Sequence, residues 1–286
     1  MDCGALDPVI GLEEFLELSR KETTVILDCR GSQTDSAAGE LLYTQGHIPG
    51  AQRIDMARDV TGVRTGKNGR TPLADPETFA ALLRRFGLTE GGTLLLYDRE
   101  FLPHAPRVWF TVRTIGFANV FVLDGGFTSW AKAGLPLETE AVTKPEGNVT
   151  AKESLERVFT IAEIEENLIS KKYLLVDARV ESAYLGKNGG ADPRAGHIPG
   201  SLSYPARLNI APSGLFYGKD RLRENFLKLS DGAPEKILHT CGSGVAACLN
   251  LLATRHAGLA TAGVYIGSFS EWISAPNHQV STEDES

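Results

Sequence analysis

The chain alternates short, mostly apolar runs with longer stretches in which apolar residues recur at helical spacing. A short apolar run without polar alternation is typical of a strand that is buried on both faces of a parallel sheet. Strands that alternate with helices predict α/β domains, each a doubly wound parallel sheet flanked by helices. Residues 25–27 and 174–176 are predicted strands, and the runs at residues 93–98, 120–126, 236–241 and 262–268 continue the pattern.

This pattern of strands and helices occurs twice along the chain. The sequence Gly-His-Ile-Pro-Gly at residues 46–50 recurs unchanged at residues 196–200, and a five-residue identity that includes His and Pro is not expected by chance. An Asp-x-Arg tripeptide follows a predicted strand in each half and begins at Asp28 and Asp177. The repeat therefore predicts two copies of one domain.

The repeat and the composition together set the domain boundaries. The 286 residues suit two domains of about 140 residues each. Residues 138–156 are polar, contain Pro and Gly, and lack periodicity, which is typical of a linker. We predict an N-terminal domain at 1–140, a linker at 141–156, a C-terminal domain at 157–280 and a frayed acidic tail at 281–286.

Charge and composition exclude several classes of function. The net charge of -7 offers no basic face for nucleic acid or an anionic membrane surface. No apolar run approaches the roughly 18 residues that span a bilayer, and the acidic N-terminus does not resemble a signal peptide. Four cysteines without a C-x-x-C pair predict neither disulfides nor a bound metal, and no cofactor motif is found. We expect a cytoplasmic protein that acts through a thiol.

The strongest candidate for that thiol is Cys241. It follows a predicted strand, and the loop Cys-Gly-Ser-Gly-Val-Ala leads into a predicted helix. Gly242 and Gly244 allow the backbone N–H groups to turn inward, and the helix N-terminus adds about half a positive charge at the same point. Such a cradle favours an anionic sulfur. Asp98 stands at the equivalent position of the first half. A buried structural cysteine before a Gly-rich turn is the alternative.

Other loops give weaker signals. A phosphatase loop needs an Arg six residues after the cysteine, where this chain has Ala247. His239 lies two residues before Cys241 and shares its strand face, as a thiol hydrolase would require, but a strand histidine is the favoured interpretation. The glycine spacing of residues 61–68 does not match a phosphate-binding loop, so this segment is predicted to be a basic surface loop.

From about residue 9 to residue 273, the repeated Asp-x-Arg, the repeated Gly-His-Ile-Pro-Gly and the loop Cys-Gly-Ser-Gly-Val-Ala resemble the tandem-domain rhodaneses, which are sulfurtransferases. The loop is similar to that of the 3-mercaptopyruvate sulfurtransferases. This resemblance implies a degenerate N-terminal domain with Asp98 in place of the nucleophile. It also implies a catalytic C-terminal domain in which Cys241 takes sulfur from 3-mercaptopyruvate as a persulfide and releases pyruvate.

The resemblance also implies acceptors and leaves alternatives open. The acceptor would be a thiol, such as thioredoxin or a small thiol, or cyanide. Thiosulfate is the alternative sulfur donor. A different class of function is a persulfide carrier or sensor that does not turn over small molecules. Ser243 would pass protons beside the reacting sulfur, with His47 and Asp35 as its partners.

For the donor carboxylate, the resemblance implies two arginines. Arg194 matches one of them, while Ala183 occupies the place of the other, and Lys187 is the nearest substitute cation. The loop residues of the donor site would be Gly242, Gly244, Val245 and Ala246. Position 246 is usually Thr in the family loop, so one side-chain hydrogen bond of the cradle is missing here.

Overall fold

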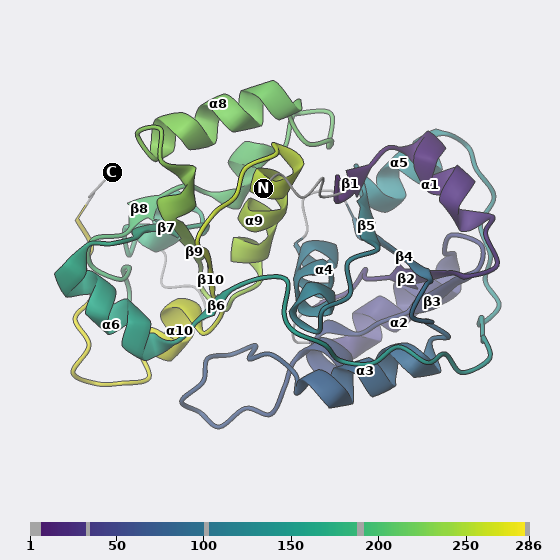
Figure 1. The fold of residues 1–286 in the computed structure, drawn as a ribbon, viewed down its shortest axis with the longest axis horizontal. Coiled ribbons are helices and arrows are strands. Elements are labelled where there is room, and N and C mark those ends of the chain that lie inside the picture. Colours follow the sequence, from purple (N-terminus) through teal and green to yellow (C-terminus); the bar gives the residue numbers. More distant parts are fainter. Residues whose placement is uncertain (1–6, 33–34, 100–102, 188–191, 284–286) are drawn as a thin grey trace. The chain divides into compact units, whose positions relative to one another are not determined.

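The repeated sequence pattern folds into two parallel sheets of five strands each, one in each half of the chain (Figure 1). In the computed structural model the described residues are 7–32, 35–99, 103–187 and 192–283. By its internal contacts the chain divides into unit 1, which is Met1–Gly62 with Leu73–Glu156, and unit 2, which is Val63–Pro72 with Arg157–Ser286.

Unit 1 contains the first sheet, with strand order β1-β5-β4-β2-β3 and every pair parallel. The side chains of Phe15 and Trp130, from α1 and α5, pack on one face of the sheet against Ile26 and Leu95. The elements of unit 1 are β1 (Val9–Ile10), α1 (Leu12–Ser19), β2 (Thr24–Asp28), α2 (Ser36–Gln45), β3 (Ala51–Arg53), the helical turn η1 (Met56–Val60), α3 (Pro76–Arg85), β4 (Thr93–Tyr97), α4 (His104–Thr114), β5 (Val120–Leu123) and α5 (Gly126–Lys132).

Unit 2 repeats this topology, with strand order β6-β10-β9-β7-β8 and every pair parallel. Helices α6 and α10 cover one face of the sheet, and α8 and α9 cover the other. The elements are β6 (Val158–Phe159), α6 (Ile161–Ser170), β7 (Leu174–Asp177), α7 (Glu181–Tyr184), β8 (Leu202–Ser203), η2 (Ala206–Asn209), α8 (Lys219–Leu229), η3 (Pro234–Lys236), β9 (Ile237–Thr240), α9 (Ala246–His256), β10 (Gly263–Tyr265) and α10 (Ser268–Trp272).

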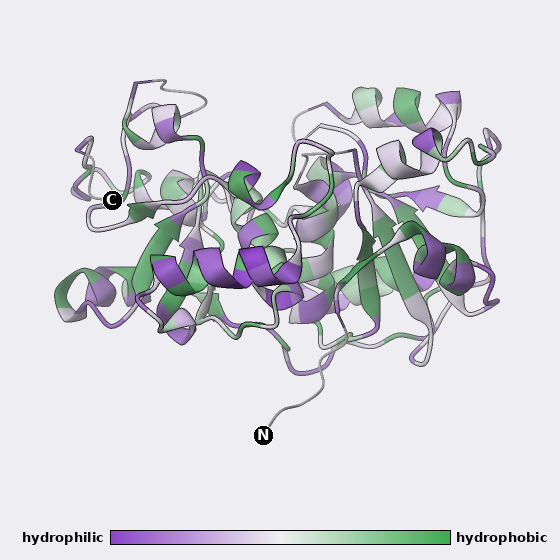
Figure 2. Ribbon diagram, turned by 90° about the horizontal axis from the view of Figure 1, so that it is seen from above, coloured by the Kyte–Doolittle hydropathy of each residue, from purple (hydrophilic) through white to green (hydrophobic). Residues whose placement is uncertain are grey.

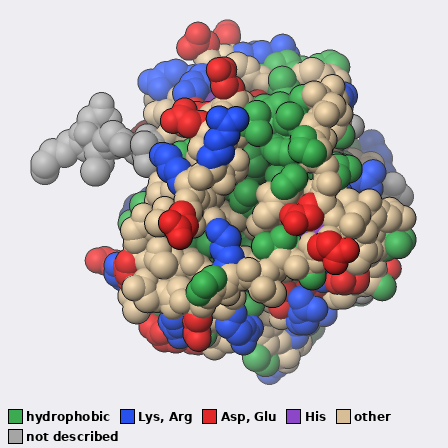
Figure 3. Space-filling model, turned by 90° about the vertical axis from the view of Figure 1, so that its right-hand side faces the viewer, with side chains coloured by type: hydrophobic (Ala, Val, Ile, Leu, Met, Phe, Trp, Pro, Cys, Tyr) green, Lys and Arg blue, Asp and Glu red, His purple; other side chains and the backbone are tan. Residues whose placement is uncertain are grey.

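The distribution of hydropathy follows this layering. The strands of both sheets are mostly hydrophobic, whereas polar residues concentrate on the helices and loops (Figure 2). Figure 3 looks onto one face of the molecule, where hydrophobic side chains gather in a hollow bordered by acidic and basic ones. The predicted α/β class and the two parallel sheets are confirmed. Among the described residues, no helix combines the length and the apolar character needed to cross a membrane.

The segment predicted as a linker is packed onto unit 1 instead of crossing the surface freely. Residues 141–156 form neither helix nor strand, but Gly147 and Lys152 donate backbone hydrogen bonds to the carbonyls of Arg84 and Ile115. The Val149 side chain is only 1% exposed. The start of the predicted tail is also held, because Ser281 exchanges two backbone hydrogen bonds with His197.

Candidate active site

Cys241 lies in the turn between β9 and α9, as the sequence predicts. Its Sγ accepts a hydrogen bond of 3.1 Å from the Gly244 N–H. Gly244 has a φ of +75°, and a Cβ there would lie 2.1 Å from the Ile266 carbonyl oxygen, so only glycine fits this turn. The Cys241 side chain is 2% exposed, which makes these protein contacts the main partners of its sulfur.

A second polar group beside the sulfur comes from α10. The Oγ of Ser268 accepts a hydrogen bond of 3.2 Å from the Cys241 N–H and lies 3.8 Å from Sγ. Ser268 was not predicted as a site residue. The signal that reveals it is a difference between the two repeats, since the equivalent residue of unit 1 is Gly126.

Two arginines border the Cys241 loop, and neither was predicted as a site residue. A Cβ on Gly242 would lie 3.2 Å from Arg70 Nη2 and 3.4 Å from Arg179 Cδ. The Arg179 guanidinium bonds the Asp177 carboxylate at 2.7 Å. Burial lowers the pKa of Arg179, but Asp177 outweighs it and raises the pKa above its ordinary value, with a smaller contribution from Cys241.

Arg70 reaches the loop because Val63–Pro72 packs with unit 2. Its backbone N–H donates to Ser270 Oγ at 3.0 Å, and its guanidinium forms an ion pair with Asp192. The Thr71 hydroxyl donates to the Ser243 carbonyl. Residues 63–67 are exposed, as expected for a surface loop, but Arg70 and Thr71 contact the Cys241 loop.

The two predicted carboxylate-binding residues differ in their surroundings. Arg194 donates to the carbonyls of Ala275 at 3.4 Å and His278 at 2.5 Å, which follow α10. Lys187 is exposed. Val245 is the N-cap of α9 and Ala246 its first residue, so both are in the predicted loop-to-helix junction.

The predicted proton-relay partners of Ser243 belong to unit 1. His47 is fully buried, its ring stacks on Tyr43 at 3.8 Å, and its Nδ1 lies 2.9 Å from the Tyr43 carbonyl oxygen. His197 has the same arrangement with Tyr184, at 3.6 Å and 2.7 Å. Asp35 is exposed and caps α2 by accepting from the Ala37 N–H. Both histidines thus anchor their repeated turns.

The equivalent of the Cys241 loop in unit 1 holds a carboxylate. Asp98 follows β4 and accepts backbone N–H bonds from Arg99, His104 and Ala105 at 2.7, 2.8 and 3.1 Å. Burial raises the pKa of Asp98 to about 8 against the opposing effect of these three donors. The side chain therefore occupies the position in unit 1 where Cys241 Sγ lies in unit 2.

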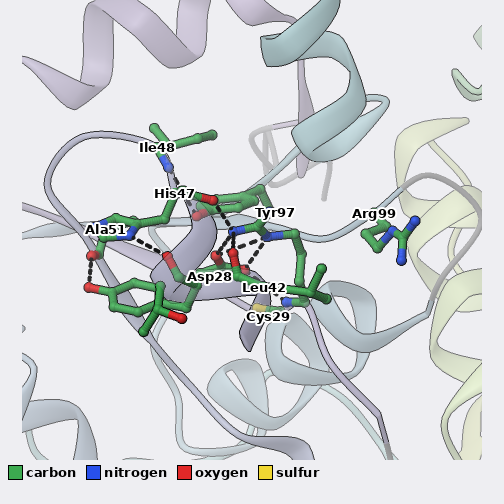
Figure 4. A network of polar contacts seen from close by, with 12 residues as sticks. Asp28, Cys29, Leu42, His47, Ile48, Ala51, Tyr97 and Arg99 are labelled. Carbon is green, nitrogen blue, oxygen red and sulfur yellow. Dashed lines mark hydrogen bonds and ion pairs between the residues drawn. The ribbon is translucent and has the colours of Figure 1, made fainter. Parts of the chain in front are cut away.

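Unit 1 also contains a buried polar network at the ends of β2 and β4 (Figure 4). The Arg30 guanidinium bonds the Asp28 carboxylate at 2.6 Å and the Gly46 carbonyl at 2.8 Å. The Tyr97 hydroxyl accepts the Ile48 N–H at 3.3 Å. This network ties the first Asp-x-Arg to the first Gly-His-Ile-Pro-Gly turn, which is a structural role for both motifs.

The other thiols have surroundings unlike that of Cys241. Burial, reinforced by the Asp98 and Asp28 carboxylates, raises the pKa of Cys29 well above its ordinary value. Cys248 is fully buried on α9 and donates to the Gly244 carbonyl at 3.2 Å. Cys3 lies outside the described residues. His239 is a core residue of β9, where burial lowers its pKa to about 3, as the strand-histidine interpretation predicts.

Comparison with known proteins agrees with this architecture. The rhodanese-like domain family matches residues 11–133 and 160–275. A probable 3-mercaptopyruvate sulfurtransferase of Pseudomonas aeruginosa is 35% identical over 91% of this chain and 93% of its own length. The thiosulfate sulfurtransferase of Cricetulus griseus is 33% identical over 81% of this chain and 78% of its own length.

A solved structure of a sulfurtransferase is also similar to this chain. The crystal structure of SseA from Escherichia coli, described as a 3-mercaptopyruvate sulfotransferase, superposes with a TM-score of 0.78 at 30% identity and covers 92% of this chain and 99% of its own. The two sheets, the repeated motifs and these matches agree, and the chain belongs to the rhodanese family of sulfurtransferases, with two rhodanese-like domains.

Proposed function

We propose that this protein transfers sulfur from 3-mercaptopyruvate to a thiol or cyanide through a persulfide on Cys241, in the cytoplasm. The observation that carries the proposal is the Gly244 N–H bonded to Cys241 Sγ in a buried turn. A preorganised donor in a dry site stabilises a sulfur anion more than the same donor would in water. Relatives named for this donor cover most of the chain.

The chemistry follows in two half-reactions. The Cys241 thiolate attacks the donor sulfur, an S–S bond forms, and the C–S bond breaks with its electron pair going to the pyruvate enolate. The thiol proton of the donor is transferred to the enolate carbon, which gives pyruvate and a Cys241 persulfide anion. An acceptor thiolate then takes the outer sulfur and becomes a persulfide, or cyanide takes it and becomes thiocyanate, and the Cys241 thiolate is restored.

Proton transfer in the first half-reaction is proposed to pass through Ser243. Its backbone carbonyl is held by the Thr71 hydroxyl, which fixes the loop that carries the side chain. His47 and Asp35 remain predictions as its partners. The Nδ1 of His47 is already bonded to Tyr43, so a catalytic His47 would act through Nε2.

Binding of the donor carboxylate is proposed for Arg194 and Lys187, and Arg70 is added because it lies at the loop itself. A guanidinium can hold a carboxylate with two parallel hydrogen bonds. Gly242 and Gly244 contribute by leaving space for the donor and exposing backbone N–H groups, and Val245 and Ala246 start the helix that points at the sulfur.

Thiosulfate is the second candidate donor. The observation that favours thiosulfate is that Arg70 and Arg179 lie beside Gly242. The Gly-Ser-Gly sequence of the loop has no charged side chain and does not predict these two cations. Each of these cations is paired with a carboxylate, Asp192 or Asp177, so their charge is largely compensated. This balance favours a singly charged donor, and we retain 3-mercaptopyruvate as the leading substrate.

Mass spectrometry tests the persulfide. Treatment with 3-mercaptopyruvate is expected to add about 32 Da, one sulfur atom, to the intact protein, with pyruvate released in equal amount. Cys241→Ser is expected to abolish both signals, and Cys29→Ser serves as the matched control that retains them. Sulfur added to the Cys241→Ser variant contradicts the assignment. Loading without repeated pyruvate release in excess thiol would instead support a carrier.

A further inference from the structure

We propose that unit 2 has a second ligand site, a cavity between η2 and α8 that binds a small aromatic anion. The cavity has a volume of about 640 Å³, and cavities of about 300 to 1,000 Å³ are typical of small-molecule sites. The residues that line it lie between Leu202 and Leu229, so they precede β9 and the Cys241 loop. The inference does not rest on the proposed sulfur donor.

The charged side chains that line this cavity are cations. Arg207 belongs to η2, and Arg221 and Lys228 belong to α8. The chain as a whole has 36 acidic and 29 basic residues, so a lining with three cations has the opposite sign to the net charge. Within the described ranges, neither Arg221 nor Lys228 is paired with a carboxylate. Their charge can therefore attract an anionic ligand.

The spacing of residues along α8 separates its cations from its carboxylates. Arg221, Asn225 and Lys228 follow one another at intervals of four and three residues, which places them on one face of the helix. Asp220 and Glu224 are their neighbours in sequence, but they line a second depression on α8. The face that borders the cavity is therefore positively charged.

Two of the three cations are held in place by other groups of unit 2. The Arg221 guanidinium stacks on the Tyr217 ring, with Cζ 3.6 Å from the ring centroid. Arg207 donates through Nη1 to the Ile210 carbonyl at 3.0 Å. A stacked guanidinium keeps its N–H groups at its edge, where they can donate to a phosphate or a carboxylate. Because these side chains are already ordered, binding an anion costs less conformational entropy.

The rest of the lining is mostly apolar and partly aromatic. Tyr204 belongs to the hydrophobic core under α8, and Tyr217 and Leu229 pack against that core. Leu208 also lines the cavity and is 50% exposed, although it is apolar. An apolar ligand group would remove this surface from water. Two tyrosines and a stacked guanidinium provide flat partners, which favours an aromatic ring over an alkyl chain.

Buried hydrogen bonds hold the two walls of the cavity together. Asn209 ends η2, is fully buried, and donates from its side chain to Asn250 Oδ1 of α9 at 2.7 Å. The Asn209 carbonyl accepts the Tyr217 N–H at 2.9 Å, which ties the segment before α8 to η2. The cavity is therefore preformed, as ligand sites commonly are.

Comparison with unit 1 shows that the shared fold does not require a polar face here. Helices α3 and α8 precede equivalent strands, and their buried positions coincide when they are aligned from their first residues. In this alignment Asn225 corresponds to Leu82, which is buried. Unit 1 thus packs an apolar side chain where unit 2 places an amide beside its cations. The cavity is a property of unit 2.

Isothermal titration calorimetry of the full chain with matched probes tests the ligand class. The probe 1-naphthyl phosphate has both a ring and a charge, whereas 1-naphthol has only the ring and inorganic phosphate has only the charge. We expect 1-naphthyl phosphate to bind at least about tenfold more tightly than either, because the apolar lining and the cations both contribute. The singly charged 1-naphthoate should bind more weakly than the phosphate. Equal affinity for 1-naphthol and 1-naphthyl phosphate would overturn the proposal.

Substitutions on α8 locate the bound probe. Arg221→Gln and Lys228→Gln should each raise the Kd of 1-naphthyl phosphate about threefold to tenfold, between the effects of an exposed ion pair and of a hydrogen bond to a charged group. Leu208→Glu, at an exposed position, should abolish binding by placing a carboxylate among the cations. Arg223→Gln is the matched control: it removes the same charge from α8 outside this cavity, and the Kd should not change.

Sulfur-transfer kinetics separates this site from the one at Cys241. The α8 variants should keep the wild-type kcat/KM for 3-mercaptopyruvate, and Arg70→Ala should keep the wild-type Kd for 1-naphthyl phosphate. If Arg70→Ala abolished binding of the probe while Arg221→Gln and Lys228→Gln retained it, the probe would occupy the Cys241 loop and the proposal would be wrong. Loss of sulfur transfer from the proposed donor would refute the proposed function and leave this result unchanged.

Discussion

The two units have the same fold but differ in single residues at equivalent positions. Asp98 and Cys241 follow equivalent strands, and each places an acceptor atom against backbone N–H groups of the following turn. Unit 1 has a carboxylate where unit 2 has a sulfur. The sequence alignment of the repeats predicts this equivalence, because it depends on strand spacing. It does not predict the contact between Ser268 Oγ and Cys241 Sγ, because the two residues are 27 positions apart.

The buried Asp98 carboxyl gives unit 1 a defined pH dependence. Its pKa is about 8 in the folded protein and about 3.9 when unfolded. Between these values the folded state holds a proton that the unfolded state has lost, so the free energy of unfolding decreases as pH rises, by up to about 1.4 kcal/mol per pH unit. Asp98→Asn does not titrate, and its amide oxygen still accepts N–H bonds.

We therefore expect Asp98→Asn to gain stability relative to wild type as pH rises from 5 to about 8. Urea unfolding at these two pH values measures the difference. Asp75→Asn is the control that should show no change relative to wild type between these two pH values, because N–H donation from Thr78 lowers the pKa of Asp75 and its contribution is lost only below about pH 4. Parallel wild-type and Asp98→Asn curves would show that Asp98 stays ionised.

At the scale of elements, the apolar runs predict the central strands well. Residues 174–176 fall within β7, and residues 25–27 fall within β2. The edge strands β1, β6 and β8 have two residues each, too few to form a periodic pattern. The prediction of a surface loop holds only for the exposed first half of the segment Val63–Pro72. Its later residues are polar and contact groups 122 to 200 positions away, which no local pattern reveals.

This segment provides a testable cation, Arg70, at the Cys241 loop. Arg70→Ala is expected to raise the KM for 3-mercaptopyruvate about tenfold to a hundredfold, since a hydrogen bond to a charged group contributes about 1.5 to 3 kcal/mol. Arg70→Lys should recover only part of this loss, because an ammonium lacks the planar fork. Steady-state kinetics measures both variants.

Lys67→Ala, in the exposed half of the same segment, is the matched control and should leave KM unchanged. Arg194→Ala tests the other predicted contact, since its guanidinium is bonded to backbone carbonyls. An increased KM in Arg194→Ala together with an unchanged KM in Arg70→Ala would assign the donor carboxylate to Arg194.

For the whole molecule, the duplicated topology could be predicted because both copies retain the strand spacing and the Gly-His-Ile-Pro-Gly turn. The choice of sulfur donor could not be predicted from the sequence, because it depends on which charged side chains are paired in the folded protein. Arg70 and Arg179 are each balanced by an aspartate, and the chain carries a net charge of -7. Doubly charged thiosulfate is therefore repelled more strongly than singly charged 3-mercaptopyruvate.

We expect kcat/KM to favour 3-mercaptopyruvate over thiosulfate by at least about a hundredfold, equivalent to roughly 2.7 kcal/mol. The ratio should narrow between about 0.01 M and 0.15 M salt, as the Debye length falls from about 30 Å to about 8 Å and screens the net charge. Asp192→Asn should narrow it further by leaving Arg70 uncompensated. A wild-type preference for thiosulfate would mean that the paired arginines still bind a dianion, and the argument from charge balance would be wrong.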